Sequence, residues 1–109
     1  MIYLILGMII AIIIIGTLAI KDRDSTPEIK LVKCIGENSI LYAQTGCSAC
    51  KTQEDLFGEN YKYLNNINCK LETQKCIEVN ITKTPTWIIN KEKYSGVQTI
   101  ERLKELTGC

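Results

Sequence analysis

The sequence predicts a small α/β domain behind an N-terminal membrane-spanning helix. One observation is the distribution of charge: the chain has 109 residues and is 46% apolar, but every charged residue lies from Lys21 onward. The other is that short apolar runs, typical of buried strands, alternate with helical periodicities after this point. We therefore divide the chain into an anchor (residues 1–20), a linker (21–26) and one α/β domain (27–109).

The uncharged segment over residues 2–20 is long enough to cross a bilayer, since a helix of that length spans about 28 Å. No Lys or Arg precedes it, which favours an uncleaved single-pass anchor over a cleaved signal peptide or a buried core helix. Lys21 and Arg23 weakly favour a cytoplasmic domain. The six cysteines and the glycosylation sequon Asn80-Ile81-Thr82 favour the extracytoplasmic side, which we expect.

Composition excludes several functions. The 13 basic and 12 acidic residues give a net charge of +1, with no basic run that would indicate nucleic-acid binding. The chain has no histidine, which excludes Ser-His and Cys-His catalysis and every zinc site that contains histidine.

The first half of the domain is predicted to alternate helix and strand. Ser25 and Thr26 before Pro27 indicate a helix start, and Gly36 indicates its end. Residues 40–43 form a short apolar strand, and a helical pattern follows over 47–64. Residues 67–71 alternate as a second strand would, and 72–79 are long enough for a short helix. The first helix is expected to bury Ile29, Val32 and Ile35.

The second half is predicted to be a hairpin followed by a helix. Residues 86–89 form a strand, 90–92 a turn and 93–94 the returning strand. Ser95 and Gln98 have the spacing of a capping box, which opens a helix closed by Gly108. Its buried face would carry Val97, Ile100, Leu103 and Leu106.

The most informative motif is Cys47-Ser48-Ala49-Cys50, at the junction of a predicted strand and a predicted helix. At that position the free backbone N–H groups and the helix dipole stabilise a thiolate at Cys47. Cys50, one turn later, is placed to resolve a mixed disulfide. The pattern favours a redox pair over a structural disulfide or half of a zinc knuckle. Thr84-Pro85-Thr86, just before an apolar strand, indicates a tight turn that could hold a cis proline.

These residues resemble the thioredoxin fold, in which a central mixed sheet is flanked by helices. More narrowly, the chain from about residue 27 to 108 is similar to the thioredoxin-like domain fused to, or encoded beside, membrane enzymes of the vitamin K epoxide reductase (VKOR) type. The segments that carry the resemblance are Leu41-Tyr42-Ala43, Cys47-Ser48-Ala49-Cys50-Lys51, Gln53, Leu56-Phe57-Gly58, Pro85-Thr86-Trp87 and Tyr94-Ser95-Gly96-Val97-Gln98.

The resemblance implies that Cys47 is the exchanging nucleophile and Cys50 the resolving thiol. It also implies that Pro85 is cis and lies against the cysteine pair, where the backbone of Thr84 can bond an extended substrate strand. Trp87 is expected to be a core aromatic, although it could also line the substrate groove. Domains of this family face the outside and pass electrons from reduced proteins to the membrane enzyme, and the domain itself needs no metal or other cofactor.

The chain departs from the family at two places. Ser48-Ala49 stands where the family more often has Pro-His, so no imidazole stabilises the Cys47 thiolate, and we expect a less strongly oxidising pair. The strand 40–43 has no acid, so Cys50 must lose its proton to water or to a nearby group, for which Glu54 is a weak candidate.

The remaining cysteines are predicted less sharply. Cys69 and Cys76 enclose a loop of about eight residues, whose closure stabilises by about 2.5 kcal/mol in the chain-entropy model. Related domains often carry a cysteine pair here, so a structural disulfide is the leading interpretation, ahead of reduced thiols, a second redox pair or zinc. Cys34 and Cys109 belong to no motif. They could bond each other, bond a partner or stay reduced.

The sequence thus predicts a membrane-anchored thiol–disulfide oxidoreductase that oxidises exported proteins and is re-oxidised by a VKOR-like partner. An anchored reductase, as in apocytochrome maturation, and a non-enzymatic interaction domain stabilised by disulfides or metal are the alternatives.

Overall fold

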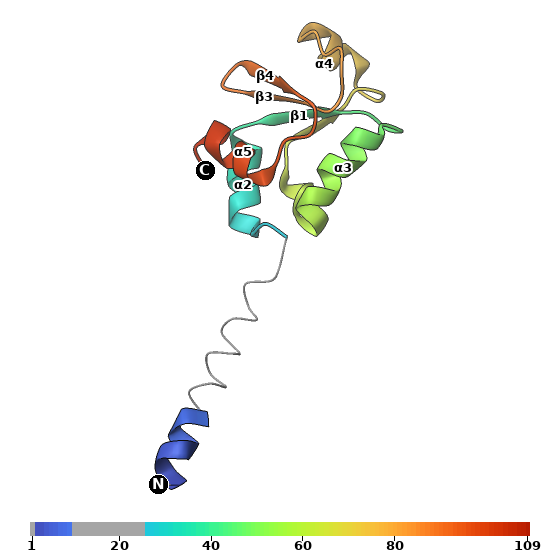
Figure 1. The fold of residues 1–109 in the computed structure, drawn as a ribbon. Helices are drawn as coiled ribbons and strands as arrows, with labels where there is room; N and C mark the ends of the chain where they lie inside the picture. The colour runs from blue at the N-terminus through green and yellow to red at the C-terminus, as the bar shows by residue number, and fades with distance from the viewer. Residues whose placement is uncertain (1, 10–25) are drawn as a thin grey trace.

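The computed structural model describes residues 2–9 and 26–109 (Figure 1). Residues 2–9 are helical. The rest of the predicted anchor and nearly all of the predicted linker lie outside the described residues. Across the described ranges, no helix is both long and apolar enough to span a membrane. The anchor therefore stays a prediction from the sequence.

A four-stranded mixed sheet forms the centre of the domain, with the strand order β2-β1-β3-β4. The central strands are β1 (Ile40–Ala43) and β3 (Thr86–Ile89), and the edge strands are β2 (Asn66–Asn68) and β4 (Glu92–Ser95). β1 pairs with β2 in parallel and with β3 antiparallel, and β3 pairs antiparallel with β4. The predicted mixed α/β sheet is confirmed, and this arrangement fits a thioredoxin-like fold.

Four α-helices and one 3-10 helix pack around the sheet in the described domain. They are α2 (Ile29–Glu37), α3 (Ser48–Phe57), η2 (Gly58–Tyr63), α4 (Thr73–Glu78) and α5 (Ile100–Thr107). α2 and α5 lie side by side (Figure 1), and a disulfide between Cys34 and Cys109 joins α2 to the residue beyond α5. This bond closes a loop with a sequence separation of 75. A loop of that size stabilises by about 4.5 kcal/mol in the chain-entropy model.

Several predicted helix ends were wrong. α2 begins at Ile29 rather than at residue 26, which leaves Ile29 47% exposed. Gly36 lies inside α2 and does not end it: a Cβ atom there would come within 2.5 Å of the Tyr63 carbonyl oxygen, so the glycine permits close packing of α2 on η2. The predicted helix over 47–64 is broken at Gly58, whose φ of 56° is left-handed and does not continue an α-helix.

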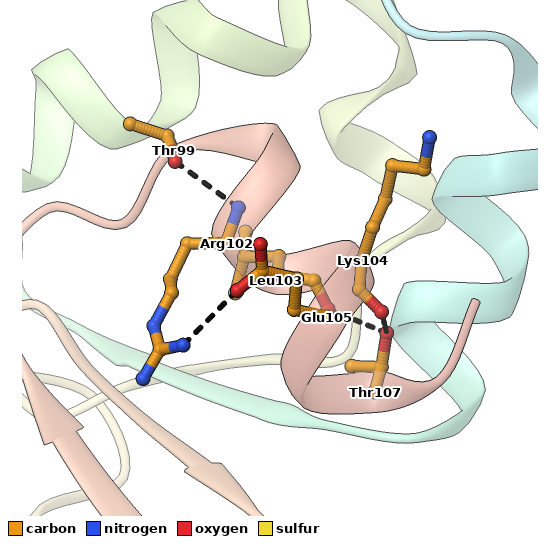
Figure 2. Close-up of polar contacts among 6 residues, drawn as sticks. All are labelled: Thr99, Arg102, Leu103, Lys104, Glu105 and Thr107. Carbon is orange, nitrogen blue, oxygen red and sulfur yellow. Dashed lines mark hydrogen bonds and ion pairs between the residues drawn. The ribbon is translucent and has the colours of Figure 1, made fainter.

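The last helix also begins later than predicted. Ser95 belongs to β4, and Thr99 caps α5 instead, its side chain accepting a hydrogen bond from the Arg102 backbone N–H at 3.1 Å (Figure 2). Val97 lies before the helix and is 39% exposed, whereas Leu103 is fully buried as predicted. Gly108, with a φ of 75°, ends the helix in the left-handed conformation that favours glycine.

The second strand and the hairpin turn differ in detail. β2 covers only Asn66–Asn68: the Cys69 backbone N–H still bonds the Ala43 carbonyl oxygen at 2.8 Å, but Leu71 N–H already bonds the Asn68 carbonyl oxygen in the turn before α4. The turn between β3 and β4 is carried by Asn90 and Lys91, both with positive φ, which is the twist that a tight hairpin requires.

A buried amide connects the core to the loop after β4. Gln53 is fully buried in α3, and its Oε1 accepts hydrogen bonds from Trp87 Nε1 at 3.0 Å and from the Gln98 backbone N–H at 2.7 Å. Its Nε2 donates to the Gln98 carbonyl oxygen at 3.0 Å. The Trp87 ring lies 6.1 Å from that of Phe57, between centroids. One side chain therefore fixes α3, β3 and the loop to each other.

We expect Gln53→Leu to lower the free energy of unfolding by roughly 2–4 kcal/mol, because it removes the partner of the buried Trp87 indole N–H and of the half-buried Gln98 backbone. Urea denaturation followed by circular dichroism measures this. The matched control is Gln74→Leu on the exposed side of α4, expected to change stability by less than about 0.5 kcal/mol. Equal effects of the two changes would show that the network contributes no stability.

Candidate active site

Cys47 lies at the N-cap of α3, directly after the turn that follows β1. In this turn Gly46 has a φ of 85°, and the Cys47 backbone N–H bonds the Gln44 carbonyl oxygen at 3.2 Å. The Cys47 sulfur accepts a hydrogen bond from the Cys50 backbone N–H at 3.2 Å. The partly exposed sulfur thus occupies the position where a helix N-terminus stabilises negative charge.

The loop before β3 approaches the same sulfur from the other side. Thr84 Oγ1 lies 3.5 Å from Cys47 Sγ, in position to donate a hydrogen bond to a thiolate. The Cys47 thiol, when protonated, can donate to the Thr84 carbonyl oxygen, also at 3.5 Å. The peptide between Thr84 and Pro85 is cis, and the Pro85 carbonyl oxygen accepts a hydrogen bond from the Gly96 backbone N–H at 2.8 Å.

These contacts shift the pKa of Cys47 downward. Desolvation by partial burial acts to raise it, but hydrogen bonds from the Cys50 thiol, the Thr84 hydroxyl and the backbone N–H groups of Cys50 and Ala49 together outweigh that effect. Cys47 therefore forms the thiolate, the form of cysteine that acts as a nucleophile, more readily than an ordinary cysteine does.

Cys50 is shifted in the opposite direction. It is 8% exposed, and burial raises the pKa of its thiol, as does the hydrogen bond it gives to Cys47. The two thiols thus differ in both exposure and acidity. Cys47 is suited to attack an external disulfide, and Cys50 holds its proton until a later step.

Thr84, Pro85 and Trp87 were the residues predicted to bind substrate, and their side chains differ in burial. Thr84 is half-buried and contacts Cys47, whereas the Pro85 side chain is fully buried. Trp87 is a core aromatic as expected, and the alternative that it lines a substrate groove was wrong: its side chain is fully buried and its indole N–H is bonded to Gln53.

An open cavity of about 330 Å³ lies beside Cys47 and Cys50. Most of the residues that line this cavity were not predicted from the sequence. Tyr61 fell within the helical pattern predicted over 47–64, and Asn66 and Asn68 belonged to no motif. The lining residues are Ala43, Gln44, Thr45, Gly46, Cys47, Cys50, Lys51, Glu54, Tyr61, Asn66 and Asn68.

The remaining four cysteines are paired in the structure. Cys69 bonds Cys76, and Cys34 bonds Cys109, which leaves Cys47 and Cys50 as the free cysteines of the described chain. Cys69 and Thr84 line the same small cavity, so the Cys69–Cys76 disulfide lies near the loop that carries Thr84. Among residues 2–9 and 26–109, no group of three His, Cys, Asp or Glu side chains could hold a metal ion.

Alkylation of the reduced protein by iodoacetamide, followed residue by residue with mass spectrometry, checks the acidity of the two thiols. We expect Cys47 to react first, with a midpoint below the ordinary thiol pKa of about 8.5, because only the thiolate reacts. Cys50 should react more slowly, with a higher midpoint. Thr84→Val removes the hydroxyl donor and should raise the Cys47 midpoint. Faster reaction of Cys50 than of Cys47 would contradict the assignment.

No family model matches this sequence. The chain is 35% identical over 101 residues to a curated protein, the thiol-disulfide oxidoreductase LTO1 of Arabidopsis thaliana. The match covers 82% of this chain but only 26% of that protein. A solved structure, the NTD_N/C domain of the alkylhydroperoxide reductase AhpF from Enterococcus faecalis, superposes with a TM-score of 0.47 at 16% identity, over 76% of this chain and 45% of that one.

The chain thus spans about a quarter of the length of its curated relative. The aligned part includes most of the described domain, since it covers 82% of the chain. The mixed sheet, the cysteine pair at the start of α3 and this sequence similarity together support a thioredoxin-like domain.

Proposed function

We propose that this chain is a thiol–disulfide oxidoreductase that exchanges disulfides through Cys47 and Cys50. One observation carries the proposal: the Cys47 sulfur lies at the N-terminus of α3 with the Cys50 N–H at 3.2 Å and the Thr84 hydroxyl at 3.5 Å. The similarity to LTO1, which is named for the same chemistry, supports it.

The chemistry proceeds in two exchanges. The Cys47 thiolate attacks a substrate disulfide, so that one Cys47–substrate bond forms and one substrate thiolate leaves. Cys50 then attacks Cys47, forming the Cys47–Cys50 disulfide and releasing the second substrate thiolate. Run in reverse, the same steps transfer a disulfide from the protein to a reduced substrate.

The activity is tested by catalysed reduction of insulin with dithiothreitol as electron donor. Cys47→Ser should reduce the rate at least about a hundredfold, to the uncatalysed background, because no other nucleophile is available at that position. The double variant Cys69→Ser/Cys76→Ser should keep its activity when it is assayed under conditions in which it is folded. Full activity of Cys47→Ser would refute the proposal, and loss of activity in the folded double variant would assign a redox role to the second pair.

We further propose that the domain is anchored by residues 1–20, faces the extracytoplasmic side and oxidises exported proteins, with a VKOR-like membrane enzyme as its oxidant. The two disulfides of the described domain support this location, since such bonds persist in oxidising compartments. The resemblance of the segment 94–98 to VKOR-associated domains supports the partner. A Cys50→Ser variant cannot resolve the mixed disulfide at Cys47, so it should trap the partner covalently in cells. Recovery of only cytosolic reductases would contradict the proposal.

A reductase is the second candidate, and Ser48-Ala49 is the observation that favours it. Neither residue supplies a cation, so the Cys47 thiolate is stabilised by uncharged donors: the Cys50 thiol, the Thr84 hydroxyl and the backbone N–H groups of Cys50 and Ala49. The reduction potential separates the two directions, and equilibration with glutathione measures it. For an oxidant we expect a value above about −200 mV, whereas a value near −270 mV, similar to thioredoxin, would assign a reductase.

A further inference from the structure

The resolving step needs a group that removes the proton from Cys50. This thiol is buried, and its raised pKa keeps it protonated near neutral pH. β1, which lies beside it, contains only Ile, Leu, Tyr and Ala and therefore has no carboxylate. The acceptor has to come from another element.

Among the described residues, Glu54 is the one carboxylate that lines the cavity beside Cys50. It lies four residues after Cys50, one turn later on the same face of α3. Both residues line the open cavity of about 330 Å³, which is large enough for several water molecules, at about 30 Å³ each. Tyr61 of η2 and Asn66 of β2 line the same cavity. A buried thiol and a carboxylate thus line one cavity that is open to solvent.

Tyr61 gives this space an orienting hydroxyl. Burial raises the pKa of Tyr61 to about 12, with further contributions from the charges of Glu54 and Cys50, so the phenol stays protonated. Its oxygen accepts a hydrogen bond from Asn66 Nδ2. The phenolic proton is therefore not used in this bond and can be donated to another acceptor.

The charges around Glu54 leave its carboxylate available to accept a proton. Lys51 Nζ lies 3.1 Å from Asp55 Oδ1 but 3.9 Å from Glu54 Oε2, so its closer partner is Asp55. The other titratable groups that line the cavity are Cys47 and Cys50 at the start of α3 and Tyr61 from η2, while β1 and β2 contribute no charged side chain there.

We propose that Glu54 is the proton acceptor for Cys50, reached through water in this cavity and oriented by Tyr61. The inference rests on the proposed function. When Cys50 attacks Cys47, its proton passes through water to the Glu54 carboxylate, the Cys47–Cys50 bond forms, and the Cys47–substrate bond breaks to release a substrate thiolate. Glu54 then returns the proton to solvent. In the reverse reaction the proton follows the same path back to Cys50.

A purely electrostatic effect of Glu54 would have the opposite sign. A negative charge near Cys50 disfavours its thiolate, so removing that charge would speed the attack. Removing a proton acceptor slows it. The sign of the change at Glu54→Gln therefore separates the two roles.

The test follows the reduced protein reacting with the chromogenic disulfide dithiobis(nitrobenzoate) in a stopped-flow instrument. The first phase releases one coloured thiolate as Cys47 forms the mixed disulfide, and the second releases another as Cys50 resolves it. Glu54→Gln should leave the first phase within about twofold and slow the second about tenfold or more. The second phase should also become steeply dependent on pH, since hydroxide must replace the carboxylate.

Three further variants sharpen the result. Glu54→Asp keeps a carboxylate and should recover part of the rate, and Tyr61→Phe should slow the second phase by less than Glu54→Gln. Glu59→Gln, an exposed acid of η2 outside the cavity, is the matched charge control and should have no effect. A second phase that is unchanged or faster in Glu54→Gln, or equally slowed in Glu59→Gln, overturns the inference. Absence of the first phase in the parent protein overturns the proposed function instead.

Discussion

The pairing of β1 with β3 is the constraint on which the rest of the site depends. Tyr42 lies opposite Thr86 in this antiparallel pair, so the end of β1 and the beginning of β3 meet at the same edge of the sheet. The chain leaves β1 into the turn that starts α3, and it enters β3 from the cis peptide before Pro85. This register is what brings Thr84 to Cys47, across a sequence separation of 37. A slip of one residue would turn the alternating side chains to the opposite face and separate the two groups.

Gln53 and the Cys34–Cys109 disulfide hold the elements around that edge in place. The amide of Gln53 bonds Trp87 in β3 and the backbone of Gln98, so the helix that carries both active cysteines is tied to the strand that follows the cis proline. The disulfide fixes the end of α5 to α2 on the other side of the fold. A domain this small has a limited apolar core, and a rigid site therefore needs such polar and covalent connections.

The asymmetry between the two thiols follows from their positions on α3. The Cys47 sulfur receives N–H and hydroxyl hydrogen bonds at the helix N-terminus, which lower its pKa, whereas burial raises that of Cys50. Cys47 therefore forms a thiolate more readily, whereas Cys50 requires a proton acceptor in the resolving step. The cavity with Glu54 and Tyr61 supplies that acceptor in a fold whose central strand carries no acid.

The sequence by itself determined the order of the elements, the limits of β1 and β3, and the cysteine pair at the head of a helix, because these depend on local periodicity and spacing. It did not determine the end of α3 at Gly58 or the cap at Thr99, since these depend on which neighbours each residue meets. Nor could it decide the pairing of Cys34 with Cys109 or the meeting of Glu54, Tyr61 and Asn66. Contacts between residues far apart in the chain are made only when the sheet and helices pack, and no local pattern encodes them.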